Sequence, residues 1–138
     1  MNNLSKVFVF KIAITIFAWC IPFLLFPPYV LKLIGLPDQQ PSYMFIRLLG
    51  WAYIALCVGY YFGLQASLAG KRSMSAIWVG IVSNGGASLY MLYFGLAGTW
   101  VDWGILFQGL AWGSAVATGL ITAGLYIYGV LGDEPVAE

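Results

Sequence analysis

Histidine is absent from this chain of 138 residues, and cysteine occurs only twice. Without histidine, the chain has no haem ligated by two histidines, no histidine-based zinc site and no imidazole proton relay. Cys20 and Cys57 both lie inside apolar segments, where single thiols usually act as small hydrophobic side chains. They form a redox pair only if the first two apolar segments pack together at that depth.

Charge is also scarce. Only 8% of the residues are charged, whereas a typical soluble domain has about 25%. Hydrophobic residues make up 62% of the chain, and its mean hydropathy is +0.88. A chain this short keeps a large surface, so this much apolar area must face lipid. The net charge of +1, without a basic cluster, gives no basis for nucleic-acid binding.

The sequence contains four long apolar segments, and a helix needs roughly 20 apolar residues to cross a bilayer. We therefore expect an all-α, integral membrane four-helix bundle that forms a single transmembrane domain over residues 1–138. The expected helices cover about residues 7–26, 43–68, 74–96 and 103–131, with a short interfacial segment at about 29–36 after the first helix. Any binding or chemistry must therefore lie between the helices or at the membrane surface.

Lysine and arginine near the helix ends indicate the orientation. Lys11 interrupts the first apolar run and no small-residue cleavage site follows, so we expect a membrane helix rather than a signal peptide. The richer side holds Lys6, Lys11, Lys71 and Arg72, against Lys32 and Arg47 on the other side. This excess of positive charge predicts that both termini lie in the cytoplasm.

Small residues four positions apart predict where helices approach closely, because contact in lipid depends on van der Waals packing. The predicted helix-packing residues are Gly59, Gly63, Gly109, Gly113 and Ala117. The last helix carries a second row of small residues, Ala115, Gly119 and Ala123. Two such faces indicate two neighbouring helices, or one neighbouring helix and a partner chain.

Arg47 is the first candidate for a binding site, because an ionisable group at membrane depth is a functional hypothesis by default. Asp102, on the same predicted side, is the second. Arg47 either extends toward the head groups, pairs with Asp102 or Asp38, or binds a lipid phosphate or another anionic ligand. No carboxylate lies in the middle of a helix, which argues against a proton or cation pump.

Asn84 and Ser88 lie one turn apart on the third helix, and Gln108 lies on the fourth. These side chains either form hydrogen bonds between helices or, if their faces converge, frame a small polar pocket with Arg47. Aromatic residues, Trp51 among them, make up 17% of the chain and either fill the membrane core or line a slot for a quinone, a carotenoid or a lipid. The sequence shows no paired nucleophile and base, so we predict no catalytic residue and no metal site.

The stretch from Phe26 to Leu64 has a recognisable order. It reads Phe-Pro-Pro-Tyr-Val-Leu-Lys-Leu-Ile-Gly-Leu-Pro from Phe26, Phe-Ile-Arg-Leu-Leu-Gly-Trp from Phe45 and Ala-Leu-Cys-Val-Gly-Tyr-Tyr from Ala55. This order resembles the small four-helix bacterial proteins of the DoxX-like group, in which a proline- and glycine-bounded segment precedes an arginine and a glycine that open the second helix. The resemblance implies that Arg47 and Gly50 are the corresponding positions. It also implies a bacterial inner membrane and, since some members are subunits of quinone-linked oxidoreductases, a quinone ligand.

Three functions fit these observations. The first is a non-enzymatic accessory or assembly subunit that docks beside a larger membrane complex. The second is a binder of an apolar ligand, such as a quinone, a carotenoid or a lipid, within a quinone-linked redox system. The third is a small oligomeric channel or transporter, which rests on size alone. Expected partners are membrane lipids and a protein in the membrane, and no nucleic acid.

Overall fold

The computed structural model describes residues 2–33 and 40–136, which form helices and no β-strand. The first span consists of α1 (Asn3–Thr15), the π-helical turn η1 (Ile16–Cys20) and α2 (Ile21–Leu25), followed by the short α3 (Pro28–Leu33). The other spans are α4 (Gln40–Leu68), α5 (Met74–Leu96), and α6 (Ile105–Leu125) with the π-helical turn η2 (Tyr126–Val130). Four helices are long and apolar enough to cross a membrane, so the predicted all-α four-helix bundle is confirmed.

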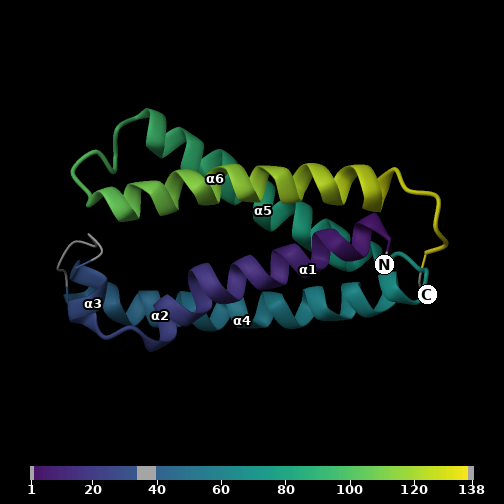
Figure 1. Ribbon diagram of the computed structural model, residues 1–138, viewed down its shortest axis with the longest axis horizontal. Helices are drawn as coiled ribbons and strands as arrows, with labels where there is room; N and C mark the ends of the chain where they lie inside the picture. Colours follow the sequence, from purple (N-terminus) through teal and green to yellow (C-terminus); the bar gives the residue numbers. More distant parts are fainter. Residues whose placement is uncertain (1, 34–39, 137–138) are drawn as a thin grey trace.

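The four spans run lengthwise along an elongated molecule (Figure 1). Both chain ends lie at one end of the bundle, and α3 lies at the other. The short helix α3 occupies the first part of the predicted interfacial segment, whose residues 34–36 lie outside the described residues. An even number of crossings places both described chain ends on the same side of a membrane.

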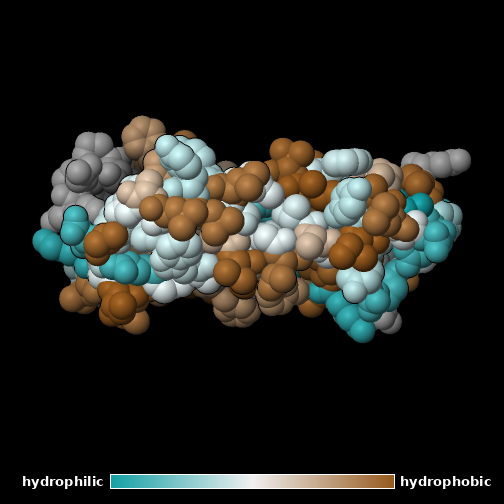
Figure 2. Space-filling view, turned by 90° about the horizontal axis from the view of Figure 1, so that it is seen from above, coloured by the Kyte–Doolittle hydropathy of each residue, from teal (hydrophilic) through white to brown (hydrophobic). Residues whose placement is uncertain are grey.

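Apolar side chains cover the outside of the bundle. Leu25, Leu96 and Ile105 are 72%, 82% and 81% exposed. Hydrophilic residues gather toward the two ends of the molecule in Figure 2, and hydrophobic residues extend along the middle. This distribution matches a lipid-facing surface between two head-group regions.

The first span does not follow one regular helix. Asn2 caps its start, since the Asn2 Oδ1 accepts a hydrogen bond from the Ser5 backbone N–H at 2.8 Å. Near its end, Pro22 has no backbone N–H, and the chain widens into η1 just before it. The helix ends at Phe26, whose extended backbone is the conformation expected of a residue before proline.

A small core joins all four spans near the end that holds the termini. Its fully buried side chains are Leu4, Phe8, Tyr60, Ile77, Ile121 and Leu125. In lipid such a cluster gains little from excluding water and depends on close dispersion contacts. The core therefore favours one register between the helices rather than driving their association.

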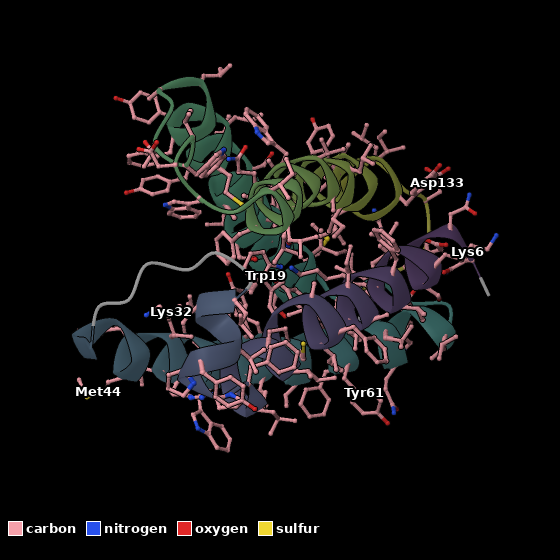
Figure 3. The ribbon with its side chains drawn as sticks, turned by 60° about the vertical axis from the view of Figure 1, so that its left-hand side comes forward. Lys6, Trp19, Lys32, Met44, Tyr61 and Asp133 are labelled. Carbon is pink, nitrogen blue, oxygen red and sulfur yellow. The ribbon has the colours of Figure 1, made fainter. Side chains whose placement is uncertain are left out.

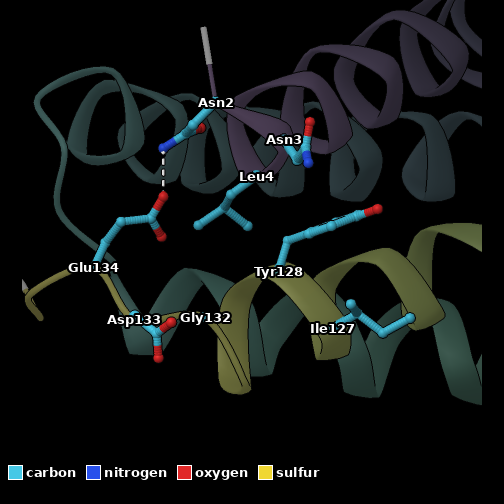
Figure 4. Close-up of a pocket in the computed structure, with 8 residues that line it drawn as sticks. All are labelled: Asn2, Asn3, Leu4, Ile127, Tyr128, Gly132, Asp133 and Glu134. Atoms are coloured by element: carbon cyan, nitrogen blue, oxygen red, sulfur yellow. Dashed lines mark hydrogen bonds between the residues drawn. The ribbon is translucent and has the colours of Figure 1, made fainter.

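Hydrogen bonds between polar side chains connect the segments at the same end of the bundle. The Asn2 Nδ2 donates to the Glu134 Oε1 at 3.0 Å and to the Ser67 carbonyl at 3.2 Å, and the Ser67 hydroxyl donates to the Asn2 Oδ1 at 2.9 Å. Figure 4 shows the bond between Asn2 and Glu134 beside an open pocket of about 550 Å³. These bonds join the start of α1, the end of α4 and the segment after η2.

The predicted packing residues fall into two groups. A Cβ added at Gly63 would lie 2.7 Å from the Ala76 Cβ and 2.8 Å from the Phe8 Cζ, so this glycine lies between α1 and α5. Gly59, Gly109 and Gly113 have nothing within 4 Å of such an atom, and Ala117 is half-buried. The second row on the last helix does pack, because the Ser88 hydroxyl donates to the Ala115 carbonyl at 2.8 Å and the Gly119 position lies 3.1 Å from the same hydroxyl.

Substituting Gly63→Ala tests this packing. We expect a lower thermal unfolding midpoint in detergent, corresponding to about 1–3 kcal/mol, because the added methyl group overpacks the contact of α1, α4 and α5. Gly59→Ala is the matched control on the same helix, where the space is open. Equal midpoints for the two variants would contradict the register between α1, α4 and α5.

Candidate functional site

Arg47 binds the end of the first span. Its Nη1 donates to the Phe23 carbonyl at 2.6 Å, and its Nη2 donates to the Phe26 carbonyl. The last carbonyls of a helix have no partner within that helix, and here the following prolines cannot supply N–H donors. Arg47 therefore uses its guanidinium as a helix cap.

The predicted partners of Arg47 lie elsewhere. Asp102 is exposed, and within residues 2–33 and 40–136 no carboxylate forms an ion pair with Arg47. Asp38, the other predicted partner, lies outside the described residues. Trp51 is 64% exposed on α4 and so faces lipid. Gln108 donates to the Val101 carbonyl at 2.8 Å and the Trp103 carbonyl at 2.7 Å, which joins the first turns of α6 to the loop before it.

The two polar residues of α5 have different roles. Ser88 belongs to the contact between α5 and α6 described above. Asn84 is 1% exposed, and its Nδ2 donates to the Gly80 carbonyl at 2.7 Å, while its Oδ1 is buried without a hydrogen-bond partner. Buried polar atoms without a partner are uncommon in proteins. The structure therefore separates the predicted site residues, and Asn84 is the member with free bonding capacity.

Lys11 is a site residue that sequence reasoning missed. Its place near the start of the first span predicts a flanking charge, but its side chain is only 7% exposed. It lies about 12 Å along the helix from Asn3, at about 1.5 Å per residue, in a hydrocarbon core of about 30 Å. Its Nζ lies 5.5 Å from the centroid of the Tyr60 ring, and no carboxylate in the described part of the chain pairs with it.

Helical spacing is the signal that could have identified Lys11. The buried positions of α1 include Leu4, Phe8, Lys11 and Thr15, which recur at alternating intervals of four and three residues. Residues at this spacing share one face of a helix. Because that face carries core side chains, a lysine on it must point into the bundle.

Lys11 and Asn84 meet at a cavity between the spans. The cavity has a volume of about 270 Å³, and its walls include Lys11, Trp19, Tyr53, Asn84, Tyr90 and Thr118. Figure 3 shows Trp19 between the layer of α1 and α4 and the layer of α5 and α6, whereas Lys6 lies at the end of the bundle. We call this space the central cavity.

The central cavity combines aromatic walls with a few polar atoms. The ring centroids of Trp19 and Tyr53 are 6.0 Å apart. The hydroxyls of Tyr60 and Ser83 are hydrogen-bonded at 2.6 Å, and the Asn84 Nδ2 lies 3.4 Å from the Ser83 Oγ. Apolar walls with a few convergent polar groups are typical of small-molecule sites. Here the polar residues include Lys11, whose side chain can donate, and Asn84, whose Oδ1 lacks a hydrogen-bond partner.

Comparisons of this chain with protein-family models, with curated proteins and with solved structures find no match. The geometry of the site is therefore the basis for a functional proposal.

Substituting Arg47→Gln tests its capping role. Hydrogen bonds to charged groups contribute about 1.5–3 kcal/mol each, so we expect a clearly lower thermal midpoint in detergent. Lys71→Gln is the control, because Lys71 is exposed. An unchanged midpoint together with the loss of a copurifying small molecule would instead make Arg47 a ligand-binding residue.

Proposed function

We propose that this membrane protein binds a lipid-soluble molecule through an oxygen-bearing head group held in the central cavity. The observation that carries the proposal is a buried lysine without a carboxylate partner, which lies on the same cavity as an unpaired amide oxygen. An isolated charge is costly in an apolar interior, and charges inside membranes usually mark ligand or ion sites. A bound oxygen atom would compensate this cost.

The two polar atoms define the chemistry of the ligand. The Lys11 ammonium donates hydrogen bonds and only binds acceptors, whereas the Asn84 Oδ1 only binds donors. A molecule that presents both, such as a hydroquinone or a lipid with a carboxyl or hydroxyl group, fits this pair. The oxidised quinone has only acceptor oxygens and so fits the Lys11 donor alone. A hydrocarbon carotenoid has neither group, so the quinone and the lipid are the better supported of the expected ligands.

The size of the cavity limits which part of the ligand it holds. Sites that enclose whole drug-sized molecules have volumes of about 300–1,000 Å³. At about 270 Å³, the central cavity suits a single ring or another compact head group rather than an entire long-chain lipid. The aromatic rings of Trp19 and Tyr53 offer flat surfaces against which such a ring can stack.

The variant Lys11→Met tests this function. It keeps the length of the side chain and removes the charge, so we expect loss of the copurifying molecule in native mass spectrometry from mild detergent. Removing an unpaired buried charge does not weaken a fold, so the thermal midpoint should stay equal or rise. Lys6→Met is the matched control, because Lys6 is exposed on the same helix.

Solvent extraction and mass analysis of the released molecule separate a quinone from a carboxyl- or hydroxyl-bearing lipid. Retention of the molecule by Lys11→Met at the wild-type level would contradict the role of Lys11. A wild-type protein that carries no small molecule from its own membrane would contradict the function itself.

An accessory role is the second candidate, supported by the outer face of α6. Gly109 and Gly113 are exposed there with nothing within 4 Å of an added Cβ, and Val116 and Leu120 are 60% and 65% exposed. Small residues that leave a shallow depression between larger apolar side chains allow a second membrane helix to approach closely. This face therefore has the form of a contact with a partner helix.

The variant Gly113→Leu tests that contact. It fills the depression without touching the bundle, so we expect a smaller assembly on native gels and an unchanged thermal midpoint of the monomer. Gly86→Leu is the control, since Gly86 is an equally open glycine on α5. The same assembly size for both variants would exclude this face as the partner contact.

A further inference from the structure

The two cysteines of the chain lie together. Cys20, the last residue of η1, is 5% exposed, and Cys57, within α4, is 8% exposed. Both line one groove between the first span and α4, and these two spans pack together at that depth, which meets the condition that the sequence set for a redox pair. Both thiols therefore belong to one space between adjoining spans, and an S–S bond formed there would lie within one chain.

Cys20 belongs to a π-helical turn. A π-turn inserts an extra residue into a helix and is frequent at functional sites. In η1 the consecutive residues Trp19 and Cys20 line two different spaces. Trp19 lines the central cavity, and Cys20 lines a groove between the first span and α4. The turn therefore lies where the central cavity and this groove adjoin the first span.

We call the second space the thiol groove. It has a volume of about 590 Å³, and both cysteines line it together with apolar side chains such as Ile16, Ile54 and Val58. The rim of the groove faces lipid, because Leu25 is 72% exposed and Tyr61 is 51% exposed. In Figure 3 the Tyr61 side chain points away from the layer of α5 and α6. Charged aqueous thiols and oxidants are poorly suited to such a groove, whereas lipid-soluble molecules are well suited to it.

We propose that Cys20 and Cys57 form a reversible dithiol–disulfide couple that is oxidised by a lipid-soluble quinone entering the thiol groove. The reaction breaks two S–H bonds and forms one S–S bond. The two electrons and two protons pass to the quinone, whose two carbonyl oxygens become the hydroxyls of a hydroquinone. An acceptor of two electrons and two protons that dissolves in the hydrocarbon core is required there, and quinones have these properties. The proposal does not depend on what occupies the central cavity.

The test uses the full-length protein in lipid nanodiscs, reduced, freed of reductant and kept without oxygen. A short-chain benzoquinone is added, and the protein is then denatured, alkylated and weighed by mass spectrometry. We expect the untreated protein to gain two alkyl groups. The treated protein gains none and is lighter by two hydrogen atoms, and one hydroquinone appears by absorbance for each protein chain.

The variants Cys20→Ser and Cys57→Ser each keep one thiol, so each should gain one alkyl group and form no stoichiometric hydroquinone. Two alkyl groups on the treated wild-type protein would overturn the proposal. A protein heavier by one quinone would also overturn it, because that product is an addition to a thiol rather than a disulfide. A disulfide-linked dimer on a non-reducing gel would overturn it as well, since the proposed bond lies within one chain.

Discussion

The cost of placing a lysine inside a membrane is the constraint on which the site depends. Lys11 lies on the buried face of α1, and its Nζ lies 5.5 Å from the centroid of the Tyr60 ring, whose π face attracts a cation. An exposed cation–π contact contributes about 0.5–1 kcal/mol, and a desolvated one about 2 or more. That gain is small beside the cost of an isolated charge in an apolar medium. The central cavity gains its chemical character from this side chain.

The other buried or half-buried cations have a different use. Arg47 donates to carbonyls at the end of the first span, and Arg72 donates to the carbonyls of Gly129 and Val130 at the end of the last span, at 3.0 and 3.2 Å. Arginine suits this task because its planar group carries several donors in a fixed arrangement. The two arginines thus stabilise opposite ends of the bundle, which leaves Lys11 as the cation that faces the central cavity in the described residues.

The number and extent of the spans could be predicted because length and apolar composition are local properties. The third span begins and ends at the predicted residues, 74 and 96. The first span contains a π-turn that no local pattern in the sequence predicts. Arg47 stands out in the sequence by its charge, but its partners are backbone carbonyls that a sequence does not display. The position of Cys20 and Cys57 on one groove depends on the register between two helices, which apolar periodicity does not determine. The resemblance to the DoxX-like group stays a prediction.

A crystal structure of the protein purified in mild detergent from its own membrane tests the central claim most directly. The account predicts non-protein density in the central cavity, with one polar atom within hydrogen-bond distance of the Lys11 Nζ and another within that distance of the Asn84 Oδ1. A Lys11 side chain that instead extends to the head-group region, beside a cavity closed by neighbouring side chains, would contradict it.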